Sequence, residues 1–214
     1  MEPYAPIAAA LEHCDVWIEF AYSTIMHSNC FRASLAAGVR YINLTGMDAM
    51  MMVRTISNID YKLVVEMGEA IQRIVQNSDE VVVKSPGGTN LRGYNRGRRV
   101  RLSGKLATEK GYPIMLAGQV SWCPIEETIE GKLVFDGALF PPMSLGKLNE
   151  PVALTLKDGR VTDIQGGREA KVFSQWMESL NDPENMYRLA HYSLGFNPGI
   201  KAVTGRIVED ERVF

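Results

Sequence analysis

The sequence predicts an α/β layer at the N-terminus followed by a strand-rich α+β domain. Up to residue 58, segments with helical and strand-like patterns alternate, which is typical of parallel strands covered by helices. From residue 80, short strand-like runs are separated by Gly, Pro and Asn instead. The chain has 214 residues, enough for one large domain or two small ones.

The N-terminal segments follow one another in a regular order. We expect helices in residues 6–15, 27–38 and 48–56, and buried strands in residues 16–20 and 39–46. Gly38 stands where the second helix should end, a common position for glycine. Because a lone helix precedes the first strand, residues 1–58 are expected to form a partial, Rossmann-like α/β domain that lacks a preceding β-α unit.

A long amphipathic helix is expected to connect the two parts, over residues 59–79. Its apolar residues recur at helical spacing, and an Asn-Ser-Asp sequence ends it. These apolar positions are Leu63, Val64, Met67, Ile71, Ile74 and Val75.

Residues 80–214 are expected to form an α+β metal-site domain. Strand-like runs occupy residues 80–85, 90–94, 98–104, 132–137, 152–159 and 160–167. Asp158-Gly159 predicts a hairpin with a type I′ turn, because both of its central residues need positive φ. Residues 168–182 predict an amphipathic helix that ends before Pro183. The last residues, 204–214, predict a charged helix or turn that completes no sheet, so we expect this domain to be incomplete at its C-terminus.

Composition excludes several classes of protein. With 46% hydrophobic and 22% charged residues the chain is globular, and 23 basic against 25 acidic residues predict no nucleic-acid partner. The most basic stretch runs from Arg92 to Arg101; it could pair with nearby glutamates or bind an anionic ligand.

The cysteines and the apolar runs give indications of the cellular location. Three widely spaced cysteines form neither a disulfide framework nor a zinc motif, which favours a reducing, cytoplasmic location. The N-terminus does not resemble a secretion signal, and no apolar run reaches the ~20 residues of a membrane helix. We therefore expect no membrane partner.

Few residues suit catalysis or metal binding. Glu126, Glu127 and Glu130 follow Pro124 and precede a strand; they could act as general bases or metal ligands, or form a solvated acidic loop. Cys123 beside them is expected to be buried rather than nucleophilic, since no basic neighbour in the sequence lowers its pKa.

The histidines form no local metal motif. His13 and His27 are expected at a helix surface and a helix start, and no HExxH, HxH or HxxxH spacing exists. His191 lies in the apolar run "MYRLAHYSLGFNPG", where it could be a core residue or a metal ligand completed by distant carboxylates. The pattern alone leaves both interpretations open.

Several motifs together resemble a known family. They are "VVVKSPGGTNLRGYNRGR", "GQVSWCPIEETIEGKLVFDG", "VTDIQGGREAKVF", "LAHYSLGFNP" and a late "ED". As an ordered set they resemble the thermophilic-type metallo-aminopeptidases and their oxygenase relatives, which include the 2,5-dihydroxypyridine 5,6-dioxygenases. The peptidases carry a metal-binding glutamate where this chain has His191, and the dioxygenases carry histidine there, so the resemblance is closer to the dioxygenases.

The resemblance implies a function and a cofactor. It implies a ring-cleaving dioxygenase for a small hydroxylated pyridine or related aromatic, with Fe(II) held by His191 and by a His-x-Asp pair expected beyond Phe214. Glu126 and Glu127 are expected to line the catalytic site. The alternatives are an aminopeptidase that uses Zn or Co, for which these glutamates match a metal-binding position, or a non-catalytic homologue. Open sheet edges and 11 methionines also predict a homo-oligomer.

Overall fold

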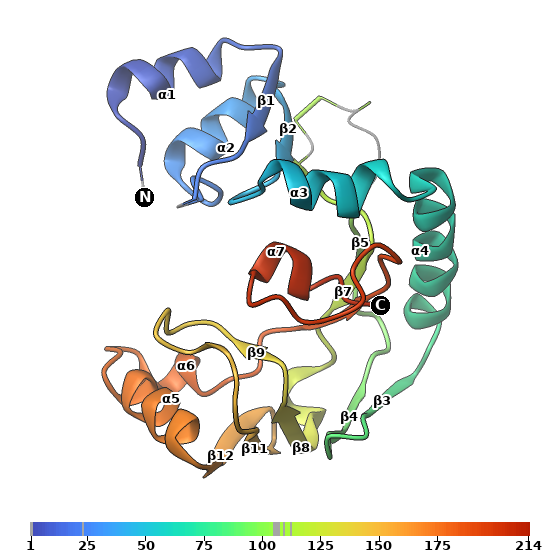
Figure 1. The fold of residues 1–214 in the computed structure, drawn as a ribbon, viewed down its shortest axis with the longest axis vertical. Helices are drawn as coiled ribbons and strands as arrows, with labels where there is room; N and C mark the ends of the chain where they lie inside the picture. The colour runs from blue at the N-terminus through green and yellow to red at the C-terminus, as the bar shows by residue number, and fades with distance from the viewer. Residues whose placement is uncertain (1, 23, 105–107, 109, 112) are drawn as a thin grey trace.

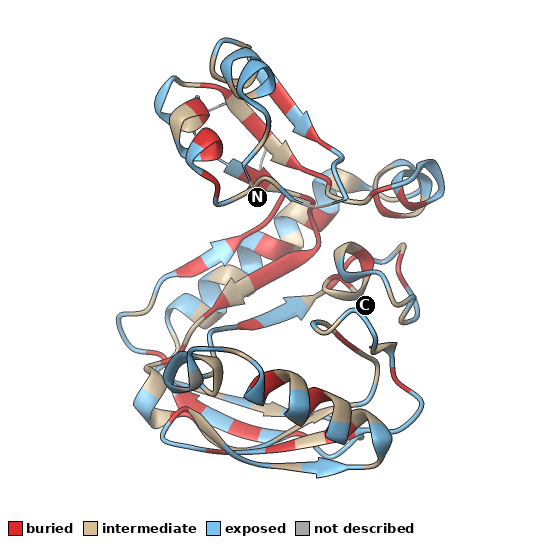
Figure 2. Cartoon of the chain, turned by 90° about the vertical axis from the view of Figure 1, so that its left-hand side faces the viewer, coloured by how far each residue is buried: buried red, intermediate tan, exposed pale blue. Residues whose placement is uncertain are grey.

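The computed structural model describes residues 2–22, 24–104, 108, 110, 111 and 113–214. It has an upper lobe formed by the N-terminal layer and a strand-rich lower lobe, with α4 (Tyr61–Gln76) along one side (Figure 1). The buried residues follow the strands and one side of the helices (Figure 2). The mixture of helices and several sheets confirms the expected α/β and α+β character.

The upper lobe is a small parallel sheet with helices beside it. Its elements are α1 (Ala5–Glu12), β1 (Val16–Glu19), α2 (Asn29–Ala36) and β2 (Arg40–Asn43). Trp17, Phe31 and Tyr41 meet edge to face in its core. Ser28 caps α2 by accepting a hydrogen bond from the N–H of Phe31 at 3.0 Å.

A strand from far along the chain completes this sheet. β6 (Pro113–Met115) pairs in parallel with β2, so the strand order is β1-β2-β6. Residues 113–115 had been expected in the lower domain, and neither their strand nor its partner was predicted. The division of the chain into domains at residues 58 and 79 remains a prediction.

Two consecutive helices lead from the upper lobe to α4. α3 (Ala49–Met52) is capped by Asp48 and continues into a π-helix over Val53–Ser57. Asp60 caps α4 through the N–H of Leu63 at 3.0 Å. Gly68 of α4 lies so close to Leu102 and Phe196 that a side chain there would collide with them, which lets the helix approach the sheet beneath it.

The lower lobe contains two antiparallel sheets. The larger has the order β12-β11-β8-β4-β3 and the smaller the order β13-β7-β5. The larger sheet comprises β3 (Glu80–Lys84), β4 (Asn90–Tyr94), β8 (Glu130–Phe135), β11 (Val152–Lys157) and β12 (Arg160–Gly166). The smaller comprises β5 (Val100–Leu102), β7 (Gln119–Trp122) and β13 (Tyr192–Gly195). One hydrophobic core, which includes Val120, Leu154 and Phe173, joins them.

The remaining elements are short, except for α5. α5 (Arg168–Glu178) packs on β11 and β12, as its apolar face predicts. Asp158 and Gly159 both have positive φ, 51° and 74°, which confirms the type I′ hairpin between these strands. The other elements are β9 (Ala138–Leu139), β10 (Gly146–Lys147), a 3-10 turn (Glu126–Thr128), α6 (Pro183–Met186) and α7 (Ile207–Asp210).

The C-terminal segment with α7 lies between the lobes (Figure 1). Asn197, fully buried, donates to the carbonyl of Thr55 at 3.0 Å and accepts from the N–H of Gly199 at 2.9 Å. Arg54 binds the buried carboxylate of Glu209 through Nε and Nη2, both at 2.8 Å. The Gly-Phe-Asn-Pro-Gly sequence after His191 therefore has a structural role, since it attaches this segment to the π-helix.

Candidate functional site at one end of the smaller sheet

His191 and the strand before the glutamates meet at one end of the smaller sheet. β13 runs antiparallel to β7, with Tyr192 opposite Trp122. His191, one residue before this pair, and Cys123, one residue after it, therefore leave the sheet at the same end. The His191 side chain is exposed and is not a core residue. Tyr192 beneath it is buried and meets Trp122 edge to face at 5.8 Å.

The glutamates lie in the turn that follows β7. Glu126 and Glu127 begin the 3-10 turn after Pro124. The β11–β12 hairpin supports this turn: Gly159 donates to the carbonyl of Ile129 at 2.9 Å, and its backbone packs directly against the carbonyl of Glu126. A side chain at position 159 would collide with that carbonyl, so glycine is required both for the turn and for this contact.

Each of the two glutamates has an arginine partner. Arg98 forms an ion pair with Glu126, and Arg188 lies 3.8 Å from Glu127. Arg92 likewise pairs with Glu130 at 3.3 Å, and Arg96 binds Asp79 through two hydrogen bonds of 2.8 and 2.9 Å. The basic stretch from Arg92 to Arg101 thus pairs largely with acidic side chains, one of the two possibilities that the sequence left open.

Burial makes Cys123 and Tyr192 poor acids. Burial raises the pKa of the Cys123 thiol, and the nearby Arg98 offsets this only partly. The thiol is also directed at the carbonyl of Pro124, at 3.2 Å. Burial, and secondarily Cys123, raises the pKa of Tyr192 to about 12. Neither group is activated as a nucleophile or general base, so the groups available for chemistry here are the imidazole of His191 and the two carboxylates.

Comparison with known proteins identifies the family. The model of the 2,5-dihydroxypyridine 5,6-dioxygenase (NicX) family matches residues 1–211. The chain belongs to this family. A 2,5-dihydroxypyridine 5,6-dioxygenase of Pseudomonas putida KT2440 is 36% identical over 76 residues, which are 35% of this chain and 21% of that protein.

Two solved structures share the fold. The structure of 2,5-dihydroxypyridine dioxygenase from P. putida KT2440 has a TM-score of 0.77 at 22% identity, over 98% of this chain and 60% of its own. Wild-type AmpT from Thermus thermophilus has a TM-score of 0.58 at 14% identity, over 89% of this chain and 58% of its own. This chain therefore spans about three fifths of the length of these solved relatives.

The other two histidines of this NicX-family chain do not join His191. His13 is exposed at the end of α1. His27 precedes α2 with a φ of 75° and meets Phe31 edge to face at 6.1 Å. Within the described residues, no three His, Cys, Asp or Glu side chains come together as a metal site. His191 is therefore a single potential ligand and not part of a complete site in this part of the chain.

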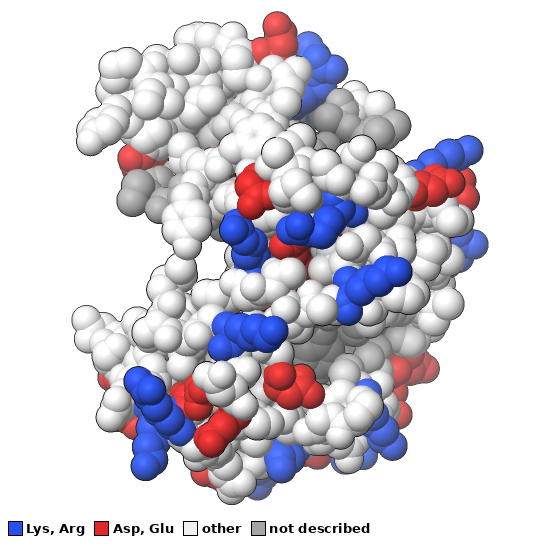
Figure 3. Space-filling model, in the orientation of Figure 1, with Lys and Arg blue, Asp and Glu red and all other residues white. Residues whose placement is uncertain are grey.

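Hollows elsewhere in the described part of the chain do not include His191. One, of about 470 Å³ between the lobes, is lined mainly by apolar residues such as Met51, Phe140 and Val208. The space-filling view shows the hollowed side between the lobes (Figure 3). Its volume suits a one-ring molecule, but His191, Glu126 and Glu127 are not among the residues that line it.

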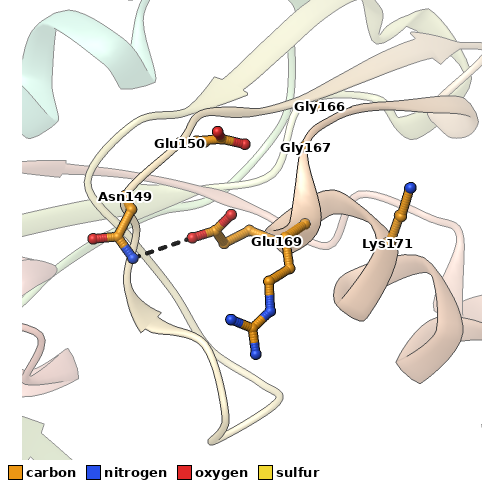
Figure 4. Close-up of a pocket in the computed structure, with 7 residues that line it drawn as sticks. Asn149, Glu150, Gly166, Gly167, Glu169 and Lys171 are labelled. Carbon is orange, nitrogen blue, oxygen red and sulfur yellow. Dashed lines mark hydrogen bonds between the residues drawn. The ribbon is translucent and has the colours of Figure 1, made fainter.

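The second hollow, of about 590 Å³, lies at the start of α5 (Figure 4). The N–H groups at a helix start attract anions, but this protein's own carboxylates occupy the position. Glu169 accepts a hydrogen bond from the Asn149 amide at 3.3 Å, and its pKa is lowered, first by its own backbone N–H. Glu150 lies against Gly167, whose lack of a side chain makes room for it. We assign no ligand to this hollow.

Proposed function

We propose that this protein is a ring-cleaving dioxygenase that acts on a small hydroxylated pyridine or related aromatic. The observation that carries the proposal is the family match over residues 1–211, together with an exposed His191 at the sheet end where Glu126 and Glu127 lie. No described helix is long and apolar enough to span a membrane. The proposal includes a cytoplasmic location and a homo-oligomer.

The proposal assigns one ligand position for Fe(II) to His191, with Zn or Co as the alternatives. Fe(II) held there would supply the redox chemistry that lets dioxygen react with a hydroxylated ring. The described residues offer one imidazole and no cluster of three donors, so they do not fit a complete metal site on their own. The remaining ligands belong, in this proposal, to the His-x-Asp pair that the family resemblance implies.

Glu126 and Glu127 are proposed as the catalytic carboxylates. A carboxylate at the sheet end can accept the proton of a ring hydroxyl, which makes the ring a better ligand and more readily oxidised. Arg98 and Arg188 hold the two side chains in place, while 35% of the Glu126 side chain and 69% of the Glu127 side chain remain exposed to a substrate.

The test is iron content and oxygen consumption of the full gene product, purified anaerobically and supplied with 2,5-dihydroxypyridine. We expect substrate-dependent oxygen uptake, with label from ¹⁸O₂ in the product. His191→Ala should lose both iron and uptake, whereas His13→Ala, which changes another exposed histidine, should keep them.

A second substrate separates the alternatives. The AmpT-like fold and the Glu126-Glu127 pair favour an aminopeptidase as the second candidate. Hydrolysis of leucine amide with Co(II) or Zn(II), without oxygen uptake, would support that candidate. Absence of both activities and of bound metal would support a non-catalytic homologue.

A further inference from the structure

One edge of the five-stranded sheet is open, and its sequence can pair with a copy of itself. β3 is the last strand of the order β12-β11-β8-β4-β3, and only β4 pairs with it. In Figure 1 the chain from α4 through β3 borders the lower lobe on its outer side. β3 consists of Glu80-Val81-Val82-Val83-Lys84 and contains no proline and no bulge, two features that block strand addition. Its exposed charges, Glu80 and Lys84, oppose pairing unless the added strand places opposite charges against them.

The register shows which backbone groups are free. The N–H of Asn95 donates to the carbonyl of Asp79, and the N–H of Ser85 donates to that of Thr89. The backbone groups of residues 79 and 85 thus face β4, and by alternation those of Val81 and Val83 do as well. The N–H and C=O groups of Glu80, Val82 and Lys84 point away from the sheet. No hydrogen bond given for the described residues outside the ladder reaches them.

The side chains of the same three residues share the exposed face. Glu80, Val82 and Lys84 are exposed, with Val82 at 52%, whereas Val81 and Val83 pack on the core. Across the described chain, neither Glu80 nor Lys84 takes part in an ion pair, although neighbouring Arg92 and Asp79 both do. The strand therefore presents two unpaired charges of opposite sign on either side of an exposed valine.

The other edge strand of this sheet, β12, is protected from pairing with a further strand. The N–H of Val161 in β12 donates to the carbonyl of Tyr187 at 2.8 Å, and Arg160 forms a bridge with Arg188. The ladder between β11 and β12 also shifts register at Thr155 and Leu156. A covering segment and an irregular register protect an edge from pairing, and β3 has neither.

We propose that β3 pairs antiparallel with β3 of a second copy of this chain around a two-fold axis at Val82. A two-fold interface places each residue opposite its symmetry mate, so Val82 meets Val82, and Glu80 of each copy meets Lys84 of the other. The outward backbone groups of all three residues are those that such a ladder uses. Both charges then gain a partner of opposite sign, and the two sheets become continuous. This interface gives the proposed homo-oligomer a specific contact, and its test does not depend on the proposed ring cleavage.

Charge reversal tests the pairing, with the molar mass in solution measured by sedimentation over a range of concentrations. We expect a dimer or a higher even-numbered assembly for the unchanged protein. Glu80→Lys or Lys84→Glu puts like charges opposite each other at both ends of the ladder and should weaken this association about tenfold or more. The double variant Glu80→Lys/Lys84→Glu should restore it, because the exchanged charges again face opposite signs.

Two further variants complete the test. Val82→Pro removes an N–H that faces away from β4, so it should dissociate the pair while the thermal unfolding temperature of the protomer changes little. Lys132→Glu makes the same charge change on the exposed face of β8, away from the edge, and should leave association unchanged. A monomer at all concentrations would overturn the proposal. Single reversals that leave the assembly intact, or a double variant that fails to restore it, would overturn it too.

Discussion

Two buried carboxylates, Glu19 and Glu209, differ in their surroundings from Glu126 and Glu127 at the end of the smaller sheet. Glu19 and Glu209 are buried, at 2% and 0% exposure, and each is bound by groups of its own protein. Glu126 and Glu127 also have partners, yet parts of their side chains remain exposed. A buried carboxylate cannot lose its partner without great cost, whereas an exposed one can exchange its partner for water or a ligand. The first pair is suited to holding the fold, and the second pair is the one to which the proposed function assigns chemistry.

The largest effect is expected where a buried carboxylate loses its partner. Arg54→Met leaves Glu209 without a cation, and its Oε2 atom already has no hydrogen bond in the described structure. We expect the free energy of unfolding to fall by about 3–5 kcal/mol, measured by urea denaturation. Arg188→Met is the matched control, because it removes the partner of the exposed Glu127, and it should change stability by less than about 1 kcal/mol. Equal losses of unfolding free energy in both variants would contradict the distinction between buried and exposed carboxylates.

The second-largest loss of stability is expected where the buried Glu19 loses its hydrogen bond from Tyr41. The hydroxyl of Tyr41 donates to Glu19 and accepts from the Asn43 amide at 2.9 Å. Burial, and then the hydrogen bond to Glu19, raises the pKa of Tyr41 far above its ordinary value, so the hydroxyl keeps its proton. Tyr41→Phe should lower the free energy of unfolding by about 1–3 kcal/mol, because two buried polar groups lose a partner. Tyr22→Phe, at an exposed tyrosine, should have no measurable effect.

Substitutions of the partly exposed Glu126 and Glu127 should change stability little and activity strongly. Glu126→Gln and Glu127→Gln are expected to change stability by no more than about 0.5 kcal/mol, as is usual for surface positions. If the proposed function holds, at least one of them should slow ring cleavage by about a hundredfold, the lower range for loss of a general base. Glu130→Gln, in the adjoining strand, is the control and should keep the rate. Stability and rate measured on the same samples separate the two roles.

The elements with a strong local signal were predictable from the sequence. The amphipathic helices α4 and α5 and the Asp158-Gly159 hairpin lie where their patterns indicated. Spacing of apolar residues and turn chemistry act over a few residues, so a single sequence reveals them. The π-helix after α3 was predicted only as a continued helix, because its different hydrogen bonding leaves no distinct mark in the apolar pattern.

Long-range pairing was not predictable. β6 joins β2 from about seventy residues away, and β7 pairs with β13 over a similar distance. Short strands of this kind depend on partners that local patterns do not reveal. The same limit applies to the site: the sequence singled out His191, Glu126 and Glu127, but only the register of β7 and β13 brings their segments to one sheet end. The Arg98 and Arg188 partners also had to come from the structure.

The smallest effect at neutral pH is expected at Tyr192, next to His191. Its folded-state pKa of about 12 lies above the ordinary value of 10, so the unfolded chain loses this proton first. Stability from Tyr192 is thus fully present below pH 10 and is lost as the pH rises to about 12. Tyr192→Phe should reduce this alkaline loss. At neutral pH it should leave stability unchanged or slightly higher, since the buried hydroxyl has no partner among the described residues.

Tyr192→Phe also tests whether Tyr192 only holds His191 in place or takes part in the reaction. Phenylalanine keeps the aromatic contact with Trp122, so β13 should still hold His191 in place. Urea denaturation at pH 7, 10 and 11.5 measures the stability, and oxygen uptake measures the proposed activity. An alkaline loss identical to that of the unchanged protein would contradict the assigned pKa. Loss of activity as great as in His191→Ala would show that the hydroxyl itself takes part, and the division between buried anchors and exposed reactive groups would then fail at this position.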